Sequence, residues 1–130
     1  RKETYSITKI SKHVLLLKAY AGMDEKIMEA VEGLNPDGIV IEALGQGNLP
    51  PALVPGMKRL IEKKVPIVIV SRCFNGIVQD VYDYQGGGKH LKQLGVIFSN
   101  GLNGQKARIK LLVALEKTSD LTEIEEMFSK

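Results

Sequence analysis

The residues with the clearest capacity for chemistry lie between a β-branched apolar run and a helical pattern. The run Ile39–Leu44 ends abruptly in Gly45-Gln46-Gly47-Asn48. In open α/β sheets, ligands bind outside the carboxyl ends of strands, where such loops lead into helices. The two glycines allow the backbone to approach a ligand closely, and the Asn48 carboxamide offers both a donor and an acceptor. Asparagine is also a good helix cap, so this pattern leaves both capping and ligand contact open for Asn48.

The glycines of this chain do not complete a nucleotide-binding motif. Gly45-Gln46-Gly47 begins a Gly-x-Gly-x-x-Gly fingerprint, but the sixth position is Pro50, which cannot give the close helix–strand packing that glycine allows. Gly86-Gly87-Gly88-Lys89 fails as a P-loop because His90 stands in place of Ser or Thr. We therefore expect no nucleotide and no other cofactor.

Neither metal ligation nor thiol chemistry is indicated. Cys73 is the only cysteine, which excludes an intrachain disulfide and fits a reducing compartment. It follows a buried apolar run and is interpreted as a small buried hydrophobe. His13 and His90 show no ligand spacing to one another, so no metal site is predicted.

A second polar segment follows the apolar run Val65–Val70. Its side chains are those of a solvated loop, and polar loop surface is the simplest interpretation. A second ligand-facing loop is the alternative. The residues concerned are Asp80, Tyr82, Asp83 and Tyr84.

The composition is that of one ordinary domain over residues 1–130. The net charge is +3, and lysines alternate with acids along the chain rather than forming a basic patch, which argues against nucleic-acid binding. The apolar runs all fall well short of the roughly 20 residues that a membrane span requires, so no membrane contact is predicted.

Strand and helix patterns alternate along the chain. This alternation predicts a small α/β domain: a doubly wound, Rossmann-like parallel sheet flanked by helices. Unalternated β-branched residues in the third run predict a strand buried on both faces. The expected strands are Val14–Lys18, Ile39–Leu44, Val65–Val70 and Gly95–Ser99, and the expected helices are Met23–Leu34, a helix from near Ala52 to Lys64, Lys89–Leu94, Gln105–Lys117 and Leu121–Phe128.

Residues at the helix ends carry further signals. Asp24 and Glu25 favour a helix start, and Ser119 and Asp120 stand where a cap is needed before the last helix. Pro55 fits only the first turn of its helix, which places that start near Ala52 or later. The apolar run Ile109–Leu115 is interpreted as core, or as core plus a surface covered by another domain.

Several segments together resemble the C-terminal domain of L-asparaginases, and in particular the cytoplasmic-type (type I-like) bacterial branch. The loop Gln46-Gly47-Asn48-Leu49 is similar to the family's Gly-Asn-Gly-Asn-Leu loop. Leu102–Arg108 resembles the family's Leu-Asn-Pro-Gln-Lys-Ala-Arg segment, with glycine in place of proline. The cytoplasmic branch is indicated by Ser71–Gly76 and Tyr84–Gly88. These pieces follow one another in the family's order and spacing, through nearly the whole chain.

The resemblance implies that the catalytic residues lie in another domain. The family hydrolyses L-asparagine through a threonine nucleophile in a larger N-terminal domain, within motifs such as Thr-Gly-Gly-Thr-Ile and His-Gly-Thr-Asp-Thr. Neither motif occurs in this sequence. We therefore expect no catalytic residue in this chain, and no asparaginase activity from it alone.

The resemblance also implies site residues and partners. Asn48 matches a family asparagine that helps to hold the α-amino end of the substrate in a neighbouring subunit's active site. Gln46 is a further candidate, and Tyr82 stands where the family has an acidic substrate-binding residue. The implied partners are an N-terminal catalytic domain of the same protein, a homodimer or homotetramer, and L-asparagine, in the cytoplasm.

Two other functions remain open at this point. One is an amino-acid-binding regulatory domain without chemistry. The other is the asparaginase-like subunit of a tRNA-dependent amidotransferase that acts on glutamyl-tRNA, against which the scattered lysines argue weakly.

Overall fold

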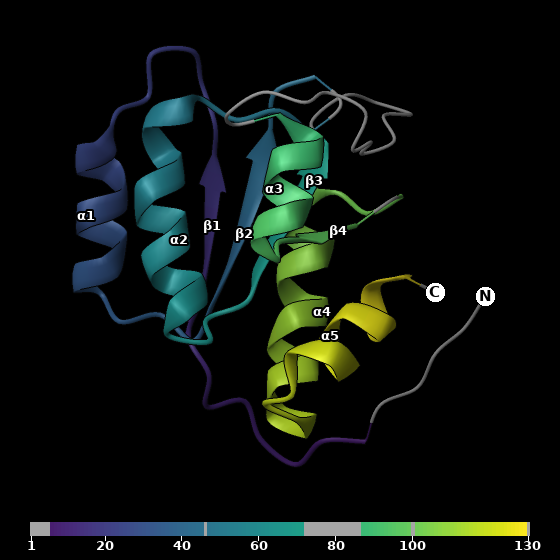
Figure 1. Cartoon of the computed structure of the whole chain (residues 1–130). Helices are drawn as coiled ribbons and strands as arrows, with labels where there is room; N and C mark the ends of the chain where they lie inside the picture. Colours follow the sequence, from purple (N-terminus) through teal and green to yellow (C-terminus); the bar gives the residue numbers. More distant parts are fainter. Residues whose placement is uncertain (1–5, 46, 72–86, 100, 130) are drawn as a thin grey trace.

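The computed structural model describes residues 6–45, 47–71, 87–99 and 101–129, and it shows a parallel sheet with helices on both faces (Figure 1). The described strands are β1 (Val14–Lys18), β2 (Gly38–Ala43), β3 (Ile67–Ser71) and β4 (Ile97–Phe98). The described helices are α1 (Glu25–Gly33), α2 (Val54–Glu62), α3 (Gly88–Leu94), α4 (Gly104–Lys117) and α5 (Leu121–Ser129), with a 3-10 turn η1 (Pro51–Leu53) before α2.

The strands pair in chain order, β1-β2-β3-β4, and every pair is parallel. The register places Val40 opposite both Leu16 and Val68, and Val68 opposite Ile97. All four carboxyl ends therefore lie at one edge of the sheet, the upper edge in Figure 1. The prediction of a parallel α/β sheet is confirmed.

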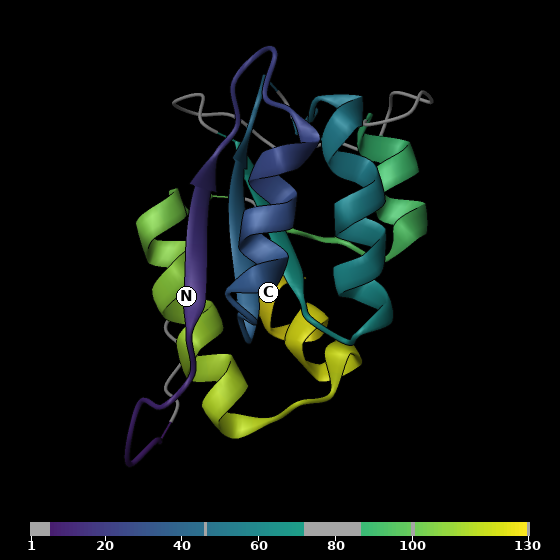
Figure 2. The same ribbon diagram turned by 90° about the vertical axis from the view of Figure 1, so that its left-hand side faces the viewer.

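Each face of the sheet has its own hydrophobic core. Ile39, Ile41 and Ile69 pack with the helices α1, α2 and α3, whereas Val40 and Val68 pack with α4 and α5. Figure 2 shows α1–α3 on one side of the strands and α4 on the other. β3 is buried on both faces, as its unalternated β-branched sequence predicts.

Side-chain caps fix the starts of three helices. Asp24 Oδ1 accepts a hydrogen bond from the Lys26 N–H at 3.0 Å, at the start of α1. Asp120 Oδ1 accepts from the Thr122 N–H at 2.8 Å, which confirms the predicted cap of α5. Asn103 Oδ1 accepts from the Lys106 N–H at 2.8 Å and so caps α4. Each bond satisfies an N–H that the first helical turn leaves without a partner.

β3 begins two residues later than predicted. The prediction placed its start at Val65, but the Val65 N–H donates to the Leu60 carbonyl at 3.0 Å and so closes the end of α2. Pro66 has no N–H to give to a ladder, although its carbonyl accepts from the Ile39 N–H at 3.0 Å. The regular strand therefore starts at Ile67.

The apolar run in α4 divides between core and surface. Leu111, Leu112 and Ala114 are buried against the sheet and α5, whereas Ile109 is 54% exposed. Lys110 Nζ lies 5.2 Å from the centre of the Phe128 ring on α5. The core interpretation thus holds for the inward residues, and within the described part of the chain Ile109 is left at the surface.

The segment leading into β1 is fastened by polar contacts. Glu116 Oε1, near the end of α4, accepts hydrogen bonds from the Ser11 N–H, from the Ser11 hydroxyl at 2.8 Å and from the Lys12 N–H at 3.0 Å. The Ser11 donors lower the pKa of the Glu116 carboxyl. Arg108 Nε donates to the Val14 carbonyl at 2.8 Å, on the outer edge of β1.

Candidate functional site

The candidate site begins with a tight turn at the carboxyl end of β2. The Leu44 N–H donates to the Asn48 carbonyl at 2.9 Å, and the Asn48 N–H donates back to the Leu44 carbonyl at 2.9 Å. The turn requires glycine at Gly47, whose φ of +111° is closed to other residues. Asn48 is therefore held at the sheet edge where ligands bind in parallel α/β folds.

The neighbouring strand fixes this turn from the side. Ser71, the last residue of β3, donates its hydroxyl to the Gly45 carbonyl at 2.7 Å. Leu49, immediately after the turn, is buried in the core beneath it. The position of the Asn48 backbone is thus set by β2, by β3 and by the core together.

Asn48 is not a helix cap, which removes one of the two interpretations that the sequence left open. The turn η1 begins only at Pro51, with Pro50 before it, and α2 begins at Val54 without a side-chain cap. The reason is local, because a residue that precedes proline disfavours the helical conformation. Leu49 and Pro50 both precede a proline, so the helix cannot start close enough to Asn48 to be capped by it. The predicted helix start near Ala52 or later is confirmed.

The Asn48 side chain contains an acceptor without a partner. The residue is half-buried, and its Oδ1 is enclosed and makes no hydrogen bond within the part of the chain that the structure describes. A buried polar atom left unpaired costs about 1–3 kcal/mol. The atom is consequently suited to accept a hydrogen bond from a donor outside the described residues, and an ammonium group is the donor that gains most from it.

A second unpaired polar atom lies at the same edge of the sheet. Ser99 directly follows β4, is 2% exposed, and its hydroxyl is buried without a partner among the described residues. Its N–H donates to the Ile69 carbonyl at 3.0 Å. Ser99 was not predicted as a site residue; the signal that the sequence offers is a polar residue immediately after an apolar run. β3 lies between Ser99 and the Asn48 turn, so the two do not form one cluster.

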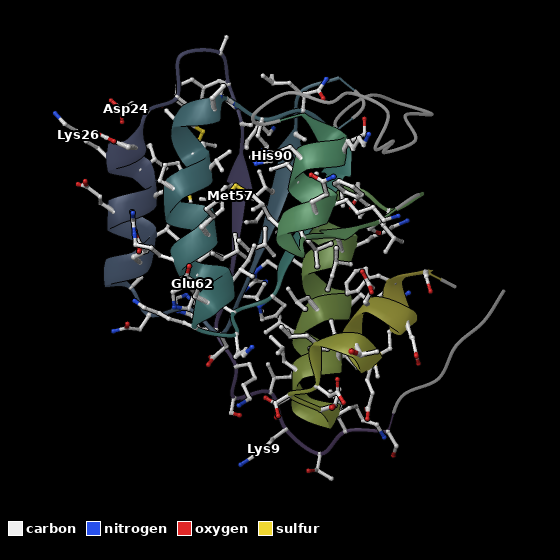
Figure 3. The ribbon with its side chains drawn as sticks, viewed as in Figure 1. Lys9, Asp24, Lys26, Met57, Glu62 and His90 are labelled. Atoms are coloured by element: carbon white, nitrogen blue, oxygen red, sulfur yellow. The ribbon has the colours of Figure 1, made fainter. Side chains whose placement is uncertain are left out.

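The remaining predicted site residues are distributed as follows. Gln46 and Tyr82 lie outside the described residues, as does Cys73. His13 precedes β1 at the amino edge of the sheet, whereas His90 lies at the start of α3, near the carboxyl edge (Figure 3).

In the described part of the chain, no group of three or more His, Cys, Asp or Glu residues could hold a metal ion. Among the helices described, none is long and apolar enough to cross a membrane.

A family model, a curated relative and a solved structure all relate this chain to the same protein family. The family described as the glutaminase/asparaginase C-terminal domain matches residues 13–128. A probable L-asparaginase of Deinococcus radiodurans is 37% identical over 130 residues. The structure of a probable cytoplasmic L-asparaginase from Campylobacter jejuni superposes with a TM-score of 0.77 at 32% identity and covers 92% of this chain.

A second group of relatives has a different name. A subunit of the glutamyl-tRNA(Gln) amidotransferase of Pyrococcus furiosus is 32% identical over 126 residues, which is 96% of this chain. All of these matches concern only part of the other protein. The chain spans 39% of the Deinococcus protein, 28% of the Pyrococcus protein and 36% of the Campylobacter chain.

Proposed function

Since the chain belongs to the family of glutaminase/asparaginase C-terminal domains, we propose that it is the C-terminal domain of an L-asparaginase, an enzyme that hydrolyses L-asparagine to L-aspartate and ammonia. The family match covers the domain, and the asparaginase activity is proposed for a whole protein that contains it. It is supported by the named L-asparaginases among the relatives and by the site at the end of β2.

The observation that carries the proposal is the unpaired Asn48 oxygen. In the proposed enzyme, Asn48 accepts a hydrogen bond from the α-ammonium group of asparagine in a neighbouring subunit's active site. The terminal torsion of a carboxamide is broad, and in the proposed enzyme the side chain turns so that Oδ1 faces the ligand. It thereby gains the partner it lacks within the described residues. The fixed turn beneath it keeps the backbone in place while the side chain reorients.

The catalytic groups belong, in this proposal, to an N-terminal domain of the same protein. The chain supplies a substrate-holding side chain and a rigid support, and alone it is inactive. A site shared between subunits requires a homodimer or homotetramer. The cytoplasmic location proposed here rests on the resemblance of the sequence and on the name of the Campylobacter protein.

The test compares variants of the complete protein that contains this chain. Asn48→Leu keeps the shape but removes the acceptor, and it should lower kcat/KM for asparagine about 10- to 150-fold, the effect of a charge-assisted hydrogen bond. The same variant should unfold at an unchanged or higher temperature, because it removes an unpaired buried polar atom. Asn35→Asp, at an exposed turn residue, is the matched control and should leave the kinetics unchanged. Wild-type kinetics for Asn48→Leu would exclude Asn48 from substrate binding.

The second candidate is the asparaginase-like subunit of a glutamyl-tRNA amidotransferase, favoured by the Pyrococcus relative and others of the same name. The two candidates differ in what the complete protein does without a tRNA-binding partner. Release of ammonia from asparagine by the protein alone supports the asparaginase. Activity that appears only with a partner protein and glutamyl-tRNA supports the amidotransferase.

A further inference from the structure

A cavity lies at the edge of the sheet opposite the Asn48 turn. Its volume is about 240 Å³, and it is formed where the end of α2, the connection from α3 to β4 and the first turns of α5 meet. Figure 2 shows α5 beside the lower end of α2, and Glu62 marks that end in Figure 3. β3 contains five residues, so its length of about 17 Å separates this cavity from the Asn48 turn.

The walls of this cavity are set by helix termini with defined geometry. Beyond Glu62, the last residue of α2, Lys64 adopts the left-handed conformation with φ +67°, and its N–H donates to the Ile61 carbonyl at 2.9 Å. α3 ends in the same way at Gly95, with φ +105°. The third wall is the start of α5, which Asp120 caps. Such termini are fixed by backbone hydrogen bonds, so the cavity exists before any ligand binds.

The lining combines an apolar floor with one charge of each sign. Ile61, Val65, Ile97 and Leu121 provide the apolar surface. Lys64 and Glu125 add an ammonium and a carboxylate, and within the described residues neither side chain makes an ion pair or hydrogen bond. A ligand that satisfies all three features carries an anion, a cation and an apolar body.

We propose that this cavity binds a free α-amino acid with a branched apolar side chain, such as leucine. The carboxylate of the amino acid pairs with Lys64, its ammonium pairs with Glu125, and its side chain packs on the apolar floor. The volume lies below the roughly 300–1,000 Å³ of sites for drug-sized molecules, which suits a ligand of this size. Because both charges are exposed to solvent, the expected dissociation constant is about 1 mM.

The test is a titration of the isotope-labelled chain with leucine, followed by backbone NMR. Saturable shifts are expected for amides around the cavity, including those of Ile61, Gly95 and Thr122, below about 50 mM leucine. The charge-deleted analogues 3-methylbutylamine and 4-methylpentanoate should each bind about two- to fivefold more weakly. Glycine, which lacks the apolar body, should not saturate the site in that range.

Matched variants assign the charges. Lys64→Asn keeps a residue that tolerates the left-handed conformation, and Glu125→Gln keeps the shape of its side chain. Each should weaken leucine binding about two- to fivefold. Lys63→Gln and Glu126→Gln alter adjacent exposed charges that do not line the cavity and should leave binding unchanged. Absence of saturable shifts around the cavity, or equal binding of leucine and its two analogues, would overturn the proposal. Neither result bears on Asn48.

Discussion

Replacement of Gly56 by alanine should destabilise the chain, although alanine is the better helix former. Gly56 is buried in α2 where this helix contacts α1. A Cβ at this position would lie 2.6 Å from Met28 Cβ and 3.2 Å from Met28 Cγ. The Cβ of Met28 is fixed to the α1 backbone, so the clash is relieved only if the helices move apart. Reaching the 3.4 Å at which ordinary contact begins requires a shift of about 0.8 Å.

The size of the effect follows from two opposing contributions. Overpacking of a tight interior costs about 1–3 kcal/mol, and the higher helix propensity of alanine returns about 0.5–1 kcal/mol. Separation of the helices also strains the two-point contact between Arg59 and Glu32, whose bonds are 2.7 and 2.9 Å long. The two contributions differ by about 0–2.5 kcal/mol. With the strain on the Arg59–Glu32 contact added, we expect a net loss of about 1–2 kcal/mol in the free energy of unfolding, or about 3–10 °C in Tm.

Urea unfolding followed by circular dichroism measures this loss directly. Gly33→Ala is the matched control, because Gly33 is the exposed last residue of α1 and a Cβ there meets nothing within 4 Å. It should be neutral or gain up to about 1 kcal/mol. If Gly56→Ala proved at least as stable as the wild type, the close approach of the two helices inferred from Met28 would be wrong.

Three further predictions concern the core between the sheet and the helices α4 and α5, the cap of α4, and the contact between Ser11 and Glu116. Leu111→Ala empties a fully buried position and should cost about 2–5 kcal/mol by calorimetry; a loss under 1 kcal/mol would mean that the face is loosely packed. Asn103→Ala removes the bond to the Lys106 N–H and should cost about 0.5–2 kcal/mol in urea, whereas Asn103→Asp should retain most of the stability. Hydrogen bonds from Ser11 lower the pKa of Glu116. The contribution of the Glu116 carboxylate to the free energy of unfolding is therefore complete above the ordinary glutamate pKa of about 4.3. It is lost as the pH falls through the lowered pKa. Hydrogen exchange at the Ser11 amide should therefore lose its protection in that acidic range, and Glu116→Gln should reduce this protection already at pH 7.

The elements of the sheet were predictable because their signals are local. β1 occupies Val14–Lys18 as predicted, since a short apolar run has one way to be buried in a sheet. The start of α2 was predictable from the prolines, which restrict the backbone whatever surrounds them. The shift of β3 to Ile67 arose because the C-terminal hydrogen bonds of α2 extend to Val65, a tertiary detail that periodicity does not encode.

The position of the candidate site was predictable from the sequence, but the burial and the hydrogen bonding of its side chains were not. The glycines and Asn48 predicted a turn at the carboxyl end of β2, and the structure contains it. That the Asn48 oxygen is enclosed, and that Ser71 fixes the turn, depend on which side chains β3 brings alongside. Gly104 is a similar case: a Cβ there would lie 2.8 Å from Glu42 Cγ, a contact between segments 62 residues apart. Spacing along the chain carries no information about such contacts.

The hydrogen bond from Arg108 to the Val14 carbonyl has a consequence for how copies of this protein meet. β1 is the first strand of the sheet, and the outward backbone groups of an edge strand invite a strand from another molecule. The guanidinium occupies the first outward carbonyl, and the exposed Lys18 places a charge at the far end. Between Val14 and Lys18, Leu16 is the one residue whose backbone N–H and C=O face outward. A single residue is too short to pair with a strand of another molecule and start cross-β aggregation. Replacement of Arg108 should therefore cause aggregation during expression before it changes the binding of any ligand.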